Sequence, residues 1–363
     1  MKISKLLMLA FFSTLFFTAC SNDDDFVADT PDSETPDTET PDTNEPRGDY
    51  DLGVLVLNEG GIGTVTYVSE DFSIVEQEIY QNVNDGNDLG GYAQSIFFDA
   101  EKAYIISNGS NLITVVNRYT FEHLGTVDSG LSVPRYGLAM NGKLYVTNQA
   151  DFSTNGDDYV AIINQETLLV ENTVVIGAAV EFMEEENGKL YIQNASYGTG
   201  DKISVFNPTT NTVETTITTN EGLNSIAIDN GFLFALSGNK LQKFNLSSQA
   251  LDSEIVLNYT DEGSAVSVAN LDIEDNQIYF TANHKVYKMG INETTAPTTA
   301  IISYESMSDY GVMYGFEVED NRIYIADAGD FASNSFVEIY DLNGTLIQNI
   351  TTGIAPNGFY FND

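Results

Sequence analysis

The chain has few of the residue types on which metal centres, disulfides and nucleophilic catalysis depend. Its 363 residues include one cysteine, two histidines and no tryptophan. A single cysteine excludes an intrachain disulfide, so the core alone must stabilise the fold. The histidines, His123 and His284, are far apart in the sequence and suggest no zinc site. Neither a Gly-x-Ser-x-Gly motif nor a Walker-type loop is present. We therefore predict a protein that is not an enzyme and holds no cofactor and no metal.

Basic residues are also scarce, with 14 Lys and Arg against 54 Asp and Glu, and the formal net charge is −40. Residues 21–49 contain eleven acids and one base, which leaves 43 acids and 11 bases for the rest of the mature chain. So acidic a surface repels phosphate groups, and we predict no nucleic-acid partner. Solubility of a secreted protein explains the charge most simply, while a cation, a neutral ligand or a basic partner surface stays open.

The N-terminus has the pattern of a secretory signal. Lys2 and Lys5 precede an apolar stretch at 6–17, and Ala19 stands directly before Cys20. The apolar stretch is too short for a confident membrane span. Small residues before a cysteine resemble a bacterial lipobox, which implies that residues 1–19 are removed and that Cys20 is lipidated. The alternative is a buried free cysteine.

Residues 20–49 are predicted to form an anchor and a stalk. The acidic run at 21–25 resembles the surface-export signal of lipoproteins in the Bacteroidetes, although a solvated acidic linker is the alternative. Residues 30–46 repeat Thr-Pro-Asp and contain almost no apolar side chains, so they cannot bury enough surface to fold. We therefore expect a lipid-anchored protein at the outer membrane, facing the cell exterior, whose only membrane contact is its lipid.

A repeat dominates the remaining chain, residues 50–363. The segment Lys143–Asn148 reads KLYVTN, and related segments place an aromatic residue at positions 104, 145, 191, 234, 279 and 324. A period of 41–46 residues filled with short apolar strands is typical of a β-propeller blade. Residues 135–177 show the unit best, with a hairpin turn predicted at Asn141-Gly142. Its four predicted strands are Tyr136–Met140, Leu144–Asn148, Tyr159–Asn164 and Leu169–Val175.

The first unit is incomplete. It has three predicted strands, at Gly53–Asn58, Gly63–Val68 and Ile74–Tyr80, and it lacks an inner strand. The C-terminal segment Ala355–Phe361 reads as an inner strand without a blade. Pairing the two closes the ring and removes a free sheet edge. The predicted fold class is all-β, a seven-bladed β-propeller in which the C-terminal strand closes the first blade.

In such blades, the loop into the inner strand and the loop between the second and third strands emerge on one face. Here these loops are long and rich in Asn, Asp, Gly and Tyr, and long loops on a rigid scaffold tend to hold function. The candidate ligand-binding residues come from these loops and the segments beside them. They are Asn58, Glu59, Tyr92, Gln94, Asn108, Arg135, Tyr136, Asn148, Asp151, Asn194, Tyr197, Asn224, Tyr314, Asp327 and Asp330.

The residue types suggest how the face would bind. Tyrosine rings suit a ring-bearing ligand, although many tyrosines in the chain could instead cap blade ends. Arg135 could pair with an acidic group of a ligand or with an acid on a neighbouring loop. The loops 151–158 and 327–330 contain several aspartates, but neither matches the spacing of a calcium-binding EF-hand.

The repeat and several short segments resemble two known groups of proteins. Through its Leu-Tyr-Val-Thr-Asn core, the repeat resembles the YVTN, or YncE-like, propellers across residues 53–363. The segments 57–60, 93–96, 327–341 and 352–356 resemble surface propeller lipoproteins of Bacteroidetes, among them the BtuG-type cobalamin-binding proteins. The resemblance implies capture of a corrinoid and its transfer to a TonB-dependent outer-membrane transporter. Alternatives are a propeller that binds a protein or glycan, and a lyase, lactonase or quinone-dependent oxidoreductase.

Overall fold

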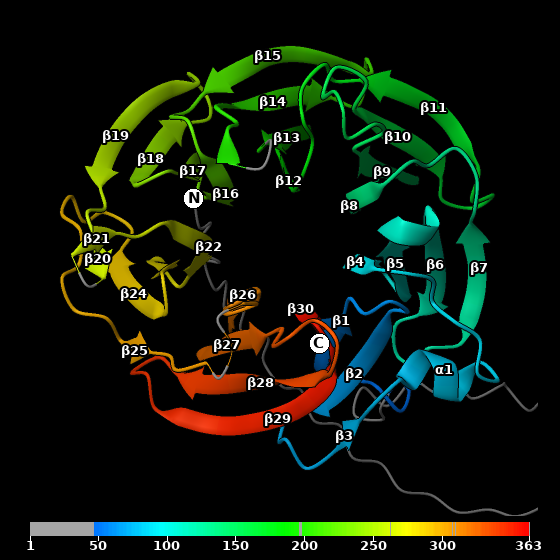
Figure 1. Cartoon of the computed structure of the whole chain (residues 1–363). Coiled ribbons are helices and arrows are strands. Elements are labelled where there is room, and N and C mark those ends of the chain that lie inside the picture. Colours follow the sequence, from blue (N-terminus) through cyan, green and yellow to red (C-terminus); the bar gives the residue numbers. More distant parts are fainter. Residues whose placement is uncertain (1–46, 196–197, 262, 307, 309, 363) are drawn as a thin grey trace, which may run out of the picture. The chain divides into compact units, whose positions relative to one another are not determined.

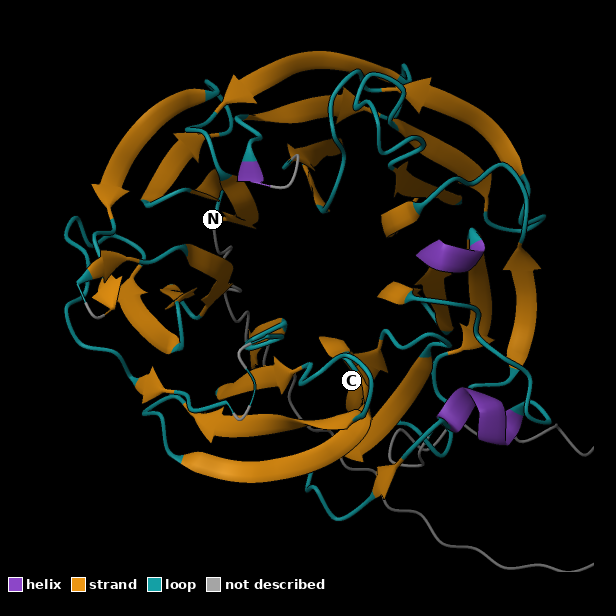
Figure 2. Cartoon of the chain, in the orientation of Figure 1, coloured by secondary structure: helices purple, strands orange, loops and turns teal. Residues whose placement is uncertain are grey.

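Seven antiparallel four-stranded sheets follow one another around a central axis, as Figure 1 shows. Figure 2 shows that strands and connecting loops make up nearly all of this ring. The computed structural model describes residues 47–362, apart from 196, 197, 262, 307 and 309. The described residues belong to one compact unit. The predicted seven-bladed, all-β propeller is confirmed.

In each blade the four strands follow one another from the central axis to the outer edge of the ring, and they are named here in that order. Blade 1 comprises β30 (Pro356–Asn362), β1 (Gly53–Asn58), β2 (Thr64–Ser69) and β3 (Val75–Glu76). Blade 2 comprises β4 (Ala93–Asp99), β5 (Lys102–Ser107), β6 (Leu112–Asn117) and β7 (His123–Val127). Blade 3 comprises β8 (Pro134–Met140), β9 (Lys143–Asn148), β10 (Tyr159–Asn164) and β11 (Val170–Val175). Blade 4 comprises β12 (Met183–Glu186), β13 (Lys189–Asn194), β14 (Lys202–Asn207) and β15 (Thr212–Thr218).

The remaining blades repeat this order. Blade 5 comprises β16 (Leu223–Asp229), β17 (Phe232–Ser237), β18 (Lys240–Asn245) and β19 (Ala250–Val256). Blade 6 comprises β22 (Val268–Glu274), β23 (Gln277–Ala282), β24 (Lys285–Gly290) and β25 (Ile302–Ser303). Blade 7 comprises β26 (Gly315–Glu319), β27 (Arg322–Asp327), β28 (Asn334–Asp341) and β29 (Leu346–Ile354). A small hairpin of β20 (Thr260–Asp261) and β21 (Ser264–Ala265) lies between blades 5 and 6 in sequence.

The second strand of each blade is apolar along its length because both of its faces are buried between neighbouring blades. In β9, Leu144 and Val146 pack with blade 2, whereas Tyr145 packs with blade 4. The aromatic residue that marks the repeat always packs with the blade that follows. Seven buried apolar clusters of described residues lie one in each interface between adjacent blades, so the cores hold the blades to one another.

The C-terminal strand closes the ring as the sequence predicts. β30 pairs with β1 in antiparallel register, with Val56 opposite Phe359 and Leu55 opposite Tyr360. From β30, Phe359 also packs on Tyr324 of blade 7, with ring centroids 5.4 Å apart. The first blade is therefore made from both ends of the folded chain, and its inner edge is covered.

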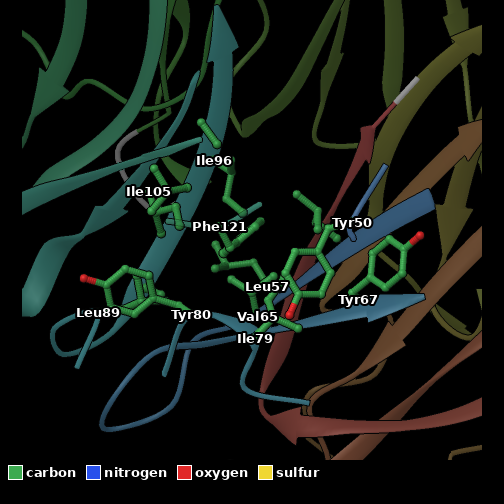
Figure 3. Close-up of a cluster of buried hydrophobic side chains, with 14 residues drawn as sticks. Tyr50, Leu57, Val65, Tyr67, Ile79, Tyr80, Leu89, Ile96, Ile105 and Phe121 are labelled. Atoms are coloured by element: carbon green, nitrogen blue, oxygen red, sulfur yellow. The ribbon is translucent and has the colours of Figure 1, made fainter. Parts of the chain in front are cut away.

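The outermost strand of blade 1 differs from the prediction. The sequence predicts a strand over Ile74–Tyr80, but β3 is only Val75–Glu76 and a short helix follows, α1 (Ile79–Val83). Glu78 has a φ of 56°, which ends the extended conformation. The helical turn places both Ile79 and Tyr80 in the core between blades 1 and 2, together with Phe121, as Figure 3 shows. Burial of these side chains decides the local structure here.

Candidate functional site

All seven inner strands begin at the same end of the central axis. We call this end the loop face, because the loops into the inner strands and the loops between second and third strands meet there. At its centre is a hollow of about 230 Å³. It is lined by six of the seven blades, through Tyr136, Phe182, Gln193, Asn224, Ser225, Ile226, Asn270, Leu271, Tyr314, Gly315, Phe316 and Asn357.

The described residues that line the central hollow include no acidic or basic side chain, although the chain carries a net charge of −40. A second hollow of about 420 Å³ adjoins it and shares Asn270 and Tyr314. The two together reach the size range of small-molecule sites, roughly 300–1,000 Å³. The loop face therefore offers an uncharged, hydrogen-bonding concavity to a ligand.

A recurrent β-bulge places the polar side chains of this mouth. In five blades, the register between the inner strand and the next strand shifts close to where the inner strand begins. A bulge re-aims side chains and frequently occurs beside functional sites. The residues at these shifts include Gln94, Arg135, Tyr136, Asn224, Asn270 and Asn357.

Three of these bulge residues, Asn224, Asn270 and Asn357, fasten neighbouring inner strands to one another. Each donates an amide hydrogen bond to a backbone carbonyl at the start of the next blade's inner strand, over 2.7, 3.1 and 2.9 Å respectively. Such a bond satisfies a carbonyl on a strand edge that no further strand covers. The fold thereby fixes the orientation of all three amides within the hollow.

Arg135 is the centre of a polar network beside the hollow. Its Nε lies 3.0 Å from Glu181 Oε2, and its Nη1 donates to Gln94 Oε1 over 2.5 Å. Gln94 also accepts from Asn108 Nδ2 at 3.0 Å and donates to the Tyr136 hydroxyl at 3.3 Å. Of the two roles that the sequence left open for Arg135, the structure shows the salt bridge. Four candidate residues, from blades 2 and 3, thus meet in one network.

Tyr136 presents a neutral hydroxyl and an aromatic edge to the hollow. Its ring lies edge-on to Phe182, with centroids 5.5 Å apart. Burial raises the pKa of the Tyr136 hydroxyl, and the nearby Glu181 carboxylate raises it further. Burial also raises the pKa of Glu181, while the Arg135 guanidinium opposes that rise. Tyr136 therefore stays protonated and can donate a hydrogen bond.

Tyr314 occupies the opposite side of the hollow, at the start of blade 7. Its hydroxyl donates to Glu59 Oε2 over 2.5 Å, and its ring lies edge-on to Phe331 at 5.1 Å. Burial raises the pKa of Tyr314, and the hydrogen bond to Glu59 adds to the effect. This pair brings blade 1 and blade 7 together at the mouth, so Glu59 and Tyr314 lie on the same face as the Arg135 network.

Exposed aromatic side chains gather on the loop face. Six phenylalanines and tyrosines of the described residues are exposed, and each belongs to one of its loops. They are Tyr92, Phe152, Phe182, Tyr310, Tyr314 and Phe331. The exposed apolar residues of the outer strands are all aliphatic. Flat rings with polar edges suit contact with a planar ligand or a sugar ring.

Three carboxylates lie deeper along the inner strands, past the residues that line the hollow. Glu184 accepts a hydrogen bond from the Ile228 N–H at 2.9 Å, and Asp272 accepts one from the Val318 N–H at 2.6 Å. Burial raises the pKa of Glu184 to about 8, and the charges of Asp272 and Glu186 contribute. Burial and the neighbouring Asp272 raise the pKa of Glu317 well above its usual value. The channel beneath the hollow is therefore unfavourable for a further anion.

Four candidate residues of the sequence analysis are buried parts of the scaffold. Asn58, Asn148, Asn194 and Asp327 are each at most 2% exposed. Asn148 accepts from the Ser132 N–H at 2.9 Å. The other three bond to neighbouring strands or segments: Asn58 donates to the Thr66 hydroxyl, Asn194 accepts from the Ser204 hydroxyl, and Asp327 accepts from the Tyr304 hydroxyl. Their polar atoms hold loop ends in place, so they do not face the hollow.

Two further candidates, Asp151 and Asp330, are exposed and accept hydrogen bonds from the backbone of their own loops. Tyr92 is 54% exposed at the rim. Tyr197 and Cys20 lie outside the described residues. Among the described residues, no group of three or more histidine, cysteine or acidic side chains is arranged to hold a metal ion.

Sequence reasoning identified three of the twelve residues that line the hollow and missed nine, among them Phe182, Gln193, Asn270 and Asn357. It also missed Glu181 beside the hollow. Asn270 and Asn357 occupy inner-strand starts equivalent to that of Asn224, so aligning the repeats would have found them. Gln193 breaks the repeat, because no other blade has a long polar side chain at its position. Phe182 and Glu181 gave no signal, because their role depends on contacts with blade 3.

Comparisons with known proteins agree with the architecture. A family model for a domain of unknown function, DUF5074, matches residues 52–362. A quinonprotein alcohol dehydrogenase-like protein from Bacteroides thetaiotaomicron VPI-5482 is similar in structure, with a TM-score of 0.65, 16% identity, and coverage of 86% of this chain and 79% of that one. No curated protein matches the chain.

Two other solved structures are similar. The computationally designed Ika8 protein has a TM-score of 0.54 at 11% identity, and the match covers 87% of this chain and 92% of the Ika8 chain. The dihydro-heme d1 dehydrogenase NirN, in complex with DHE, has a TM-score of 0.54 at 12% identity, with coverage of 88% and 77%. Identities this low show the fold alone.

No helix in the described part of the chain is both long enough and apolar enough to cross a bilayer. The DUF5074 family model matches residues 52–362, which are nearly all of the described residues. The chain therefore belongs to the DUF5074 family.

Proposed function

We propose that this propeller binds a small nutrient ligand at the loop face, and that a corrinoid such as cobalamin is the ligand. The observation that carries the proposal is the uncharged hollow, ringed by exposed aromatic side chains, in an otherwise strongly acidic protein. Corrinoids come first because the segments 57–60, 93–96, 327–341 and 352–356 resemble surface propeller lipoproteins of Bacteroidetes, a group that includes cobalamin-binding proteins.

The chemistry of a corrinoid suits this surface. Its macrocycle is broad and flat, and its rim carries carboxamide groups. Tyr136, Phe182 and Tyr314 offer ring faces or edges around the hollow. Asn224 and Asn270 offer amides whose orientation the fold already fixes, which reduces the entropy cost of binding.

The cellular context is part of the same proposal. Cys20 would carry the lipid anchor, and residues 21–49 would hold the propeller away from the outer membrane. A TonB-dependent transporter would then receive the ligand. These steps rest on the N-terminal sequence and on the family resemblance. A propeller that binds a protein or glycan at the same face is the alternative that the following experiment separates.

Calorimetric titration tests the proposal. We expect residues 21–363 to bind cyanocobalamin saturably, with haem and a siderophore as controls that do not bind. Tyr136→Ala and Phe182→Ala should each weaken binding about tenfold, equivalent to about 1.4 kcal/mol, because each removes an aromatic contact at the hollow. Leu251→Ala is the matched control, since Leu251 is also exposed but lies on an outer strand.

Two results would contradict the proposal. The absence of binding heat with cyanocobalamin at concentrations well above micromolar would exclude a corrinoid as the ligand. A glycan or a protein would then be the expected partner. Equal loss of affinity in the Leu251→Ala control would show that the effect does not depend on the loop face.

A further inference from the structure

The fifth residue of each second strand occupies the same place in all seven blades, close to the loop face. Six blades carry a short or apolar side chain there, and blade 4 carries Gln193. The six are Leu57, Ile106, Thr147, Leu236, Thr281 and Ala326. The structural repeat therefore does not explain why blade 4 has the long amide side chain of Gln193 at this position.

Gln193 is buried without being used by the fold. The residue is only 4% exposed, and what it exposes lines the central hollow. Its side-chain carboxamide makes no hydrogen bond to the rest of the described chain, in contrast to Thr147, which bonds to backbone carbonyls at the same position in blade 3. Neither polar atom of the carboxamide is among the described side-chain atoms that are both fully buried and without a partner, so the carboxamide reaches the hollow. A ligand that displaces water from this amide must replace the lost hydrogen bonds.

The surroundings of Gln193 define what that partner would be. The side chains around the hollow are amides, hydroxyls and aromatic rings. Glu184, Asp272 and Glu317 lie one or two residues further along the same inner strands. Burial already disfavours the charged form of these three acids and raises their pKa values, so the same surroundings are unfavourable for a ligand anion. A neutral group that both donates and accepts hydrogen bonds would satisfy the oxygen and the nitrogen of the Gln193 carboxamide.

We propose that Gln193 is the residue by which the hollow selects an uncharged carboxamide or acetamide group of its ligand and rejects the corresponding carboxylate. This inference deepens the proposed function and rests on the loop face being the binding surface. Gln193 would recognise a chemical group rather than a whole ligand. The side chains of a corrinoid and the acetamido groups of a sugar both provide such a group.

The decisive variant is Gln193→Leu. Leucine keeps the volume, removes both hydrogen-bonding groups and already stands at the equivalent position of blade 5, as the fully buried Leu236. We therefore expect the variant to fold and melt like the unmodified protein. Gln348→Leu, on the exposed outer strand of blade 7, is the control with the same change of side chain.

The experiment combines affinity with a signal from the residue itself. The protein is labelled with ¹⁵N, and the Gln193 side-chain amide resonance is identified by its loss in Gln193→Leu. The probes are cyanocobalamin, its monocarboxylate derivative, and N,N′-diacetylchitobiose. We expect cyanocobalamin to shift the Gln193 resonance and to bind at least about tenfold more tightly than the carboxylate, equivalent to about 1.4 kcal/mol. In Gln193→Leu that preference should fall below threefold.

The outcomes separate the two proposals. If cyanocobalamin binds but leaves the Gln193 resonance and the carboxylate preference unchanged, the inference is overturned and the proposed function stands. If cyanocobalamin does not bind while N,N′-diacetylchitobiose shifts the Gln193 resonance, the ligand is not a corrinoid but the role proposed for Gln193 is supported. If neither probe shifts Gln193, the inference is wrong.

Discussion

Deletion of residues 356–363 is expected to abolish cooperative folding of the propeller. The deletion removes β30, which supplies the inner strand of blade 1 and buries Phe359 and Asn362. Asn362 also donates 2.7 Å hydrogen bonds to the carbonyls of Tyr50 and Arg118, which ties the strand to neighbouring loops. Without β30, the inner edge of β1 is open and available for pairing with another chain.

The effect should approach the whole stability of the domain, because typical domains are stable by only about 5–15 kcal/mol. Size-exclusion chromatography and thermal melting by circular dichroism measure it. We expect aggregation, or a melting temperature lowered by more than about 10 °C. Phe331→Ala, an exposed loop substitution, serves as the control with no expected effect on folding. A monomeric deletion variant that melts within about 2 °C of the unmodified protein would contradict ring closure through β30.

The second large effect is a loss of stability as pH rises. The folded state holds a proton on Glu184 up to about pH 8, whereas the unfolded chain releases it near pH 4.5. Between these values the folded state binds more protons than the unfolded state, so the free energy of unfolding falls with increasing pH. The contribution of Glu184 is complete below about pH 4.5 and is lost as pH rises through about 8.

Glu184→Gln isolates this effect from the overall acidity of the chain. Glutamine keeps an oxygen that accepts from the Ile228 N–H but cannot ionise. We expect Glu184→Gln to match the unmodified protein at pH 5 and to be more stable by about 1–3 kcal/mol at pH 8.5, allowing for screening by channel water. Urea denaturation at both pH values measures the difference. Glu185→Gln, the adjacent exposed residue, changes the net charge equally. An identical pH response in both variants would count against a buried, protonated Glu184.

Most of the fold could be predicted from the sequence, but one segment of blade 1 could not. Blade number and ring closure were predictable, because both faces of strands such as Lys143–Asn148 are buried and the aromatic repeat marks six of the seven interfaces between blades. The stretch Ile74–Tyr80 was predicted wrongly, because strand propensity gave way to burial of Ile79 and Tyr80 against blade 2. Local patterns describe blades well and describe contacts between blades poorly.

The candidate site follows the same division. The sequence identified the loop face and placed Gln94, Arg135, Tyr136 and Asn224 there, because those loops depart from the repeat. Asn148, by contrast, ends a predicted strand beside one of these loops and is one of the candidate ligand-binding residues, but it is fully buried in the fold. The position of a β-bulge depends on the pairing of two strands, so no single-strand pattern revealed which polar side chains turn toward the hollow.

A crystal structure of residues 21–363 grown with saturating cyanocobalamin would show where and how a corrinoid binds. We expect the corrinoid on the loop face, with its macrocycle against Tyr136, Phe182 and Tyr314. A ring carboxamide should lie within hydrogen-bonding distance, about 3 Å, of the Gln193 amide. A corrinoid bound to the outer strands or to the opposite end of the channel, or a loop face left empty at saturation, would contradict the proposal.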